Sequence, residues 1–143
     1  MADRAKKLPV LPAAAAPHLH AHDGAYELCA YCPKMCRFSC PVAEADARET
    51  LTPWGKMSAP FLAARGGMTL ETAFETSWAC TGCGHCTEYC LHGNDVGSAL
   101  AGLRAAGVAA GIPSPVSARV RAAFDKAGNP TGRSLSGALR EIV

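Results

Sequence analysis

Aromatic side chains are scarce in this chain of 143 residues, which contains four Phe, three Tyr and two Trp. Alanine supplies much of the apolar content, so we expect a thin hydrophobic core that needs support from something besides packing. No apolar run approaches the roughly 20 residues of a transmembrane helix. We therefore expect no direct membrane span.

We also expect no secretory signal. Arg4, Lys6 and Lys7 precede the stretch "LPVLPAAAAP", in which three prolines interrupt the apolar residues, whereas a signal peptide needs an unbroken apolar run of roughly 7 to 15 residues. We predict that residues 1–24 form a disordered arm that ends in a histidine cluster. We also expect the protein to stay in the reducing cytoplasm, where disulfides are rare.

Strong charge and enzyme motifs are absent as well. The formal net charge is +2, which argues against a strong nucleic-acid binder. We find no glycine-rich phosphate loop and no nucleophile–base pair outside the cysteine-rich segments, so the sequence indicates no catalytic residues. Basic residues outnumber acidic ones in residues 91–143. This basic tail is either a solvated helix face or a docking surface.

Cysteine, by contrast, is abundant and grouped. Eight cysteines occur as two runs of four, "CAYCPKMCRFSC" and "CTGCGHCTEYC". A reducing compartment disfavours a disulfide framework and favours metal binding. Zinc sites usually combine separate C-x2-C pairs, whereas the second run reads C-x2-C-x2-C-x3-C, the spacing typical of 4Fe–4S ligation. We predict two 4Fe–4S clusters. The alternative is a zinc-stabilised interaction module with two zinc sites, in which four cysteines hold each zinc ion.

The two runs form an internal repeat that predicts crossed ligation. In runs of this spacing, the first three cysteines bind one cluster and the fourth binds the other. Cys36 and Cys40 would then serve different clusters, and four residues of extended chain span at most about 14 Å. We therefore expect two adjacent clusters that form a path for electrons and tie the two halves of the chain together.

The first run contains one residue more than the second. It reads C-x2-C-x3-C-x3-C, with Met35 where the regular pattern would place the third ligand. Thioether sulfur is a poor ligand for cluster iron, so we assign Cys36 as the ligand. The loop must bulge by one residue, and Pro33 suits a turn there. Pro41 fits the first position of a helix.

The remaining sequence favours helices, and we predict an all-α fold, an alpha-helical ferredoxin domain with two cluster loops. Helix formers follow Pro41, and Thr69, Asp95 and Ser114 are expected N-caps. Ser58 is expected to cap a short helix that ends at Gly66. We place the dicluster domain at residues 25–112 and a helical C-terminal extension at residues 113–143, with Leu135, Leu139 and Ile142 in a last turn or two.

The paired runs, the segment "TPWGKM" and the late "GNPTG" together resemble a known module over roughly residues 25–132. It is the helical dicluster ferredoxin module of the heterodisulfide-reductase-like iron–sulfur oxidoreductases, which include the glycolate oxidase iron–sulfur subunit. The chain is similar to the short stand-alone subunits of this family. It could alternatively be the N-terminal fragment of a larger iron–sulfur oxidoreductase.

The resemblance implies how the protein works and which residues hold its clusters. The module would relay single electrons between a flavoprotein or membrane redox subunit and a separate cysteine-rich catalytic subunit, without catalysis of its own. The first cluster would be held by Cys29, Cys32, Cys36 and Cys90. The second would be held by Cys80, Cys83, Cys86 and Cys40.

Several residues beside these ligands could tune the clusters. Thr81, Gly82 and Gly84 fit a loop whose N–H groups point at sulfur atoms, which would raise the reduction potential. Lys56 could act in the same way through its charge, but we expect a solvated lysine. His85 and His92 flank ligands, and we expect them to support the clusters or lie at the surface.

Overall fold

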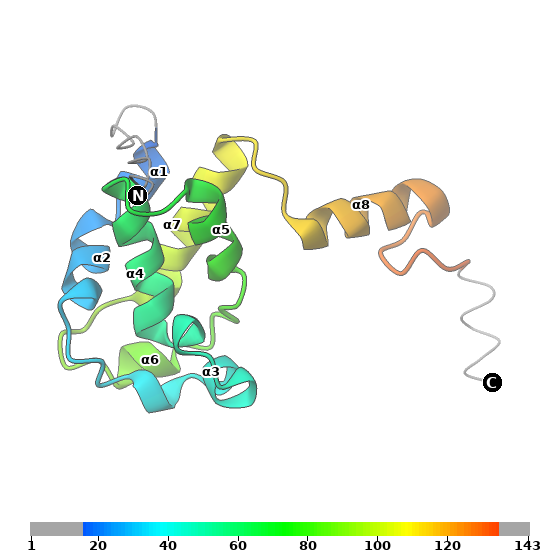
Figure 1. The fold of residues 1–143 in the computed structure, drawn as a ribbon. Helices are drawn as coiled ribbons and strands as arrows, with labels where there is room; N and C mark the ends of the chain where they lie inside the picture. Colours follow the sequence, from blue (N-terminus) through cyan, green and yellow to red (C-terminus); the bar gives the residue numbers. More distant parts are fainter. Residues whose placement is uncertain (1–15, 135–143) are drawn as a thin grey trace, which may run out of the picture. The chain divides into compact units, whose positions relative to one another are not determined.

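The computed structural model describes residues 16–134, with the side chain of Pro115 left out, and this part of the chain contains helices and no strands (Figure 1). The predicted all-helical fold is confirmed. The chain divides into two units, Met1–Gly111 and Ile112–Val143. None of the described helices is long and apolar enough to cross a membrane.

The first unit is a bundle of α-helices joined by loops and short 3-10 turns. The described elements are α1 (Pro17–His20), α2 (Asp23–Ala30), η1 (Arg37–Ser39), α3 (Pro41–Asp46), η2 (Glu49–Leu51), α4 (Pro53–Ala64), α5 (Leu70–Ser77), α6 (His85–Glu88) and α7 (Val96–Ala109). Helix α4 packs against α2, α5 and α7, while α1 packs against α7. The short elements α3 and α6 lie at one end of this bundle (Figure 1).

The core between these helices contains few large side chains. Met57, Leu100 and Leu103 are almost completely buried, and alanines fill much of the remaining space at Ala59, Ala63, Ala64, Ala73, Ala99 and Ala106. The Tyr26 hydroxyl donates a hydrogen bond of 2.7 Å to the Ala99 carbonyl and so connects α2 to α7. Small side chains let the helices approach closely but bury little apolar area, which fits the scarcity of aromatics.

The end of the predicted N-terminal arm differs from our expectation. Residues 16–24 belong to the arm that the sequence predicts to be disordered, but the structure places α1 and the start of α2 there. Leu19 is fully buried and Ala16 is 7% exposed, and both belong to the core. A single well-placed leucine gives this short segment an apolar contact that its composition does not reveal. Residues 1–15 lie outside the described residues.

Helix α4 also begins earlier than the sequence suggests. Thr52 is its N-cap, with Oγ1 accepting a hydrogen bond of 3.1 Å from the Gly55 N–H, and Pro53 occupies the first turn. Ser58, the predicted cap, lies inside the helix and donates to the Trp54 carbonyl at 2.8 Å. The predicted caps Thr69 and Asp95 are confirmed, since each accepts a backbone N–H at the start of α5 or α7.

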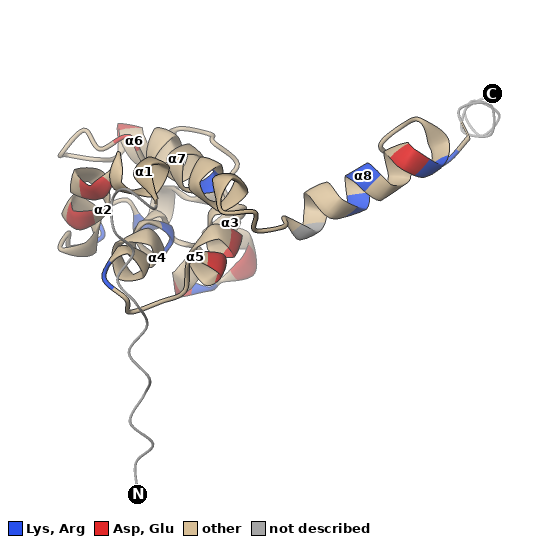
Figure 2. Ribbon diagram, turned by 90° about the horizontal axis from the view of Figure 1, so that it is seen from above, with Lys and Arg blue, Asp and Glu red and all other residues tan. Residues whose placement is uncertain are grey.

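The second unit contains α8 (Pro115–Ala127), which Ser114 caps as predicted. Gly128 ends this helix with a φ of 67°, a left-handed conformation that glycine adopts without strain. The side chain of Asn129 then closes a turn by donating to the Ala127 and Arg133 carbonyls at 3.0 and 2.7 Å. Figure 2 shows the basic residues along α8. The predicted last turn at Leu135, Leu139 and Ile142 lies outside the described residues.

Candidate metal centre

The local structure of the first cysteine run follows its spacing. Cys29 lies in the last turn of α2, Cys36 precedes η1, and Cys40 is the N-cap residue of α3, with Pro41 in the first turn of that helix as expected. Lys34, which follows Pro33, has a positive φ of 66°. The extra residue of this run is therefore accommodated in a sharp turn between Cys32 and Cys36.

The second run crosses from α5 to α7 through a glycine-rich loop. Cys80 follows α5, Cys86 lies in α6, and Cys90 follows that helix. Gly82 and Gly84 both have positive φ angles, 72° and 78°, which allows the loop to turn tightly between successive cysteines. All eight cysteines are free thiols.

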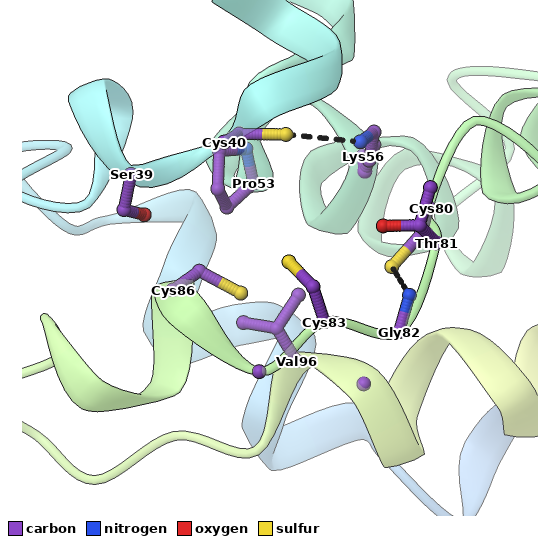
Figure 3. Close-up of a pocket in the computed structure, with 12 residues that line it drawn as sticks. Ser39, Cys40, Pro53, Lys56, Cys80, Thr81, Gly82, Cys83, Cys86 and Val96 are labelled. Atoms are coloured by element: carbon purple, nitrogen blue, oxygen red, sulfur yellow. Dashed lines mark hydrogen bonds between the residues drawn. The ribbon is translucent and has the colours of Figure 1, made fainter.

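The thiols line two cavities, and each cavity combines both runs. The first cavity, of about 230 Å³, is lined by Cys29, Cys32, Cys36 and Cys90, with Cys86 also contributing to its wall. The second is lined by Cys40, Cys80, Cys83 and Cys86 (Figure 3). The first cavity thus combines three thiols of the first run with two of the second, and the second cavity combines three thiols of the second run with Cys40 of the first. Cys86 and Val96 line both cavities, so the two sites are neighbours.

The donor set fits a cysteine-ligated cluster. Cysteine sulfur is the usual protein ligand of 4Fe–4S clusters, and each cavity has at least four free thiols. The second cavity, at about 20 Å³, is smaller than the first. No three His, Cys, Asp or Glu side chains within residues 16–134 converge on a single-ion site.

Burial and hydrogen bonding make the thiols unequal. Desolvation raises the pKa of Cys29 to about 12 and that of Cys86 to about 11, and it also raises the pKa of Cys36. A hydrogen bond from the His85 backbone N–H is the main cause of a lowered pKa at the exposed Cys83. Iron binds the thiolate, so cluster assembly must remove protons from these buried thiols.

Asn94 contacts the first group of thiols, and the sequence alone does not identify it. It is 7% exposed, and its side chain Nδ2 donates to Cys29 Sγ at 3.1 Å and to the Ala25 carbonyl at 2.9 Å. Its backbone N–H donates to Cys90 Sγ at 3.4 Å. Asn94 therefore connects two predicted ligands that lie far apart in sequence. Its position before the capping Asp95 carries no motif that would reveal this role.

The second group has two cations beside it. We expect from the sequence that Lys56 is solvated, but its side chain is 2% exposed and its Nζ lies 3.4 Å from Cys40 Sγ (Figure 3). That expectation is wrong because the fourth position of α4 faces the second cavity. Arg104 of α7 donates to the Ser77 and Cys80 carbonyls at 2.5 and 2.6 Å. Gly82, as expected for the loop, donates its N–H to Cys80 Sγ at 3.4 Å.

These features define a class of protein: a small helical iron–sulfur protein with two neighbouring sites. Residues 25–94, which contain all eight cysteines, match the family model described as 4Fe-4S dicluster domain. Comparisons with curated proteins and with solved structures gave no match. The protein therefore carries two 4Fe–4S clusters and takes part in electron transfer, and the zinc alternative is wrong.

Arg104 should anchor the start of the second cysteine loop. Arg104→Met removes the hydrogen bonds to the Ser77 and Cys80 carbonyls, and bonds of this charged kind are each worth about 1.5–3 kcal/mol. We expect a lower melting temperature and faster loss of iron from the second site than from the first. Iron release to a chelator, followed by paramagnetic resonance, measures both rates. Equal rates at the two sites would contradict this role.

Proposed function

We propose that the protein is a non-catalytic relay subunit in which the two clusters are held by crossed ligation. Cys29, Cys32, Cys36 and Cys90 hold the first cluster, and Cys40, Cys80, Cys83 and Cys86 hold the second. The observation that carries this proposal is the grouping of the thiols, since each cavity is lined by its four assigned cysteines, which come from both runs. Cys86 also reaches the first cavity, and we assign it to the second cluster together with Cys80 and Cys83 of its own run.

A 4Fe–4S cluster, when bound, accepts and releases single electrons. The chain's own residues hold the two sites close together and exclude water from part of the path. Cys29 is buried, and Val96, at 2% exposed, fills the space beside both cavities. Four cysteines for each site leave no ligand position for a substrate. The protein therefore passes electrons on and leaves the chemistry to a partner.

The partners follow from the resemblance in sequence. We propose a heterodisulfide-reductase-like assembly in the cytoplasm, in which this subunit connects a flavoprotein or membrane redox subunit to a cysteine-rich catalytic subunit. Arg119, Arg121 and Lys126 are exposed or partly exposed on α8 with Asp125 as the only acid of that helix, which suits an acidic partner. Such a surface would mainly speed encounter, and its effect should fade with added salt.

The relay function can be tested on the purified protein. We expect it to exchange electrons with an artificial one-electron donor and acceptor, and to leave glycolate, glycerol phosphate and disulfides unchanged, because both sites are closed by cysteine. Anaerobic absorption spectra follow the clusters, and product analysis follows the substrates. Turnover of any of these substrates by the protein alone would overturn the proposal.

A further inference from the structure

We propose that Lys56 makes the second cluster the higher-potential one of the pair, so that a single electron on this protein resides mainly there. The inference rests on the proposed crossed ligation, which places Cys40 at the second cluster. It assigns a role to a residue that belongs to neither cysteine run. One electron from a one-electron reductant takes a cluster from its 2+ to its 1+ state, and no bond breaks or forms.

The position of Lys56 is unusual for a lysine. Its side chain is 2% exposed, and lysine is almost never fully buried unless it is paired. No carboxylate in residues 16–134 lies within ion-pair distance of its ammonium group. The group that its ammonium contacts is Cys40 Sγ, at 3.4 Å. A buried ammonium without a carboxylate requires another anion beside it.

The thiolates of the second site supply that anion. Lys56 lines the same cavity as Cys40, Cys80, Cys83 and Cys86 (Figure 3). Reduction adds one negative charge to this site, and a nearby positive charge in a poorly solvated environment stabilises that added charge. Arg104, which donates a hydrogen bond to the Cys80 carbonyl, adds a second positive charge near this site. The positive charges of Lys56 and Arg104 both favour the reduced form of the second cluster and therefore raise its reduction potential.

The first site lacks an equivalent uncompensated charge among the described residues. Its lysine is Lys34, whose Nζ lies 3.3 Å from Glu49 Oε1 and 3.8 Å from the centre of the Trp54 ring. The Lys34 side chain is 37% exposed, so water screens it further. Asn94, which donates hydrogen bonds to two of the thiols there, is neutral. The two sites thus differ by a buried positive charge at the second.

The order of reduction in the unmodified holoprotein is the first test. Paramagnetic resonance during a stepwise reductive titration shows which cluster signal appears first. Holoproteins carrying Cys83→Ser or Cys32→Ser identify each signal, because each of these residues lines a different cavity. We expect the signal that Cys83→Ser alters to appear at the higher potential. If the signal that Cys32→Ser alters appears first, the inference is overturned.

Substitution of Lys56 is the second test. In Lys56→Met, we expect the equilibrium constant for reducing the second cluster to fall about tenfold or more, which is about 59 mV for a one-electron couple. Lys56→Arg keeps the charge and should retain most of the original potential, which a purely structural role would not predict. Lys34→Met is the matched control at the first site, and we expect a smaller shift there.

The remaining outcomes are also decisive. An unchanged second potential in Lys56→Met, or an equal shift of both clusters, would overturn the inference. If the Lys56→Met protein does not assemble its clusters, Lys56→Gln is measured in its place. The order in which the two wild-type clusters are reduced tests the inference independently of either variant. Failure of the crossed ligation would be recognised separately, because Cys83→Ser would then not alter the same signal as Cys40→Ser.

Discussion

Cys36→Ser and Cys40→Ser should damage different clusters, although the two residues are only four positions apart. Cys36 lines the first cavity and Cys40 the second. Each substitution removes one thiolate from one site, so we expect iron to fall from about eight to about four atoms per chain, as one of two 4Fe–4S clusters is lost. Iron analysis and paramagnetic resonance of the reduced proteins measure the loss.

The second run provides matched partners for these variants. Cys83→Ser should leave the same spectrum as Cys40→Ser, and Cys90→Ser the same spectrum as Cys36→Ser, because the structure groups the thiols in that way. If the spectra instead pair Cys36 with Cys40 and Cys83 with Cys90, each run holds its own cluster. That result would contradict the crossed assignment without any need to know which signal belongs to which site.

The parts of the structure that sequence can predict are those set by local chemistry. The spacing of the cysteines is enough to predict the cofactors, because the number of residues between ligands determines which iron atoms they can reach. The caps at Thr69, Asp95 and Ser114 are predictable for the same reason. Each cap is a hydrogen bond between a side chain and a backbone N–H three residues later.

The features that sequence does not reveal depend on contacts between distant segments. Lys56 looks like any solvated lysine until α4 is placed beside Cys40. Asn94 and Arg104 act on groups 65 and 24 residues away, at Cys29 and Cys80. Leu19 is buried in the core because α1 packs against α7. The order of residues along the chain does not show which distant residues come into contact. Sequence patterns therefore predict that these side chains are solvated, or give no prediction for them.

Gly55→Ala should destabilise the protein strongly. A Cβ at this position would lie 2.5 Å from the Glu49 carbonyl oxygen and 2.7 Å from that of Thr50. Both are backbone atoms of η2, so rotation of a side chain cannot relieve the contact. Overpacking of this kind typically costs about 1–3 kcal/mol and occasionally more. This explains why the segment "TPWGKM" has glycine in the first turn of α4.

The effect should extend to the second cluster. The Leu51 carbonyl of η2 accepts a hydrogen bond from Cys40 Sγ at 3.6 Å, and Lys56, which also contacts Cys40, follows Gly55 directly. A displacement of α4 from η2 therefore moves two groups that contact Cys40. We expect Gly55→Ala to melt at a lower temperature than the wild type, and to lose iron from the second site first. Thermal unfolding and iron release, measured anaerobically on the holoprotein, follow the two effects.

Gly24→Ala is the matched control, because it makes the same change in α2 where a Cβ would have no neighbour within 4 Å. Alanine is favoured over glycine inside a helix by roughly 0.5–1 kcal/mol, so this variant should be as stable as the wild type or more so. The two substitutions make the same chemical change, but only Gly55→Ala is expected to destabilise the protein. If Gly55→Ala has the same melting temperature as the wild type, α4 can move away from η2 without loss of stability. The close packing of α4 on η2 would then not be what positions Cys40 and Lys56.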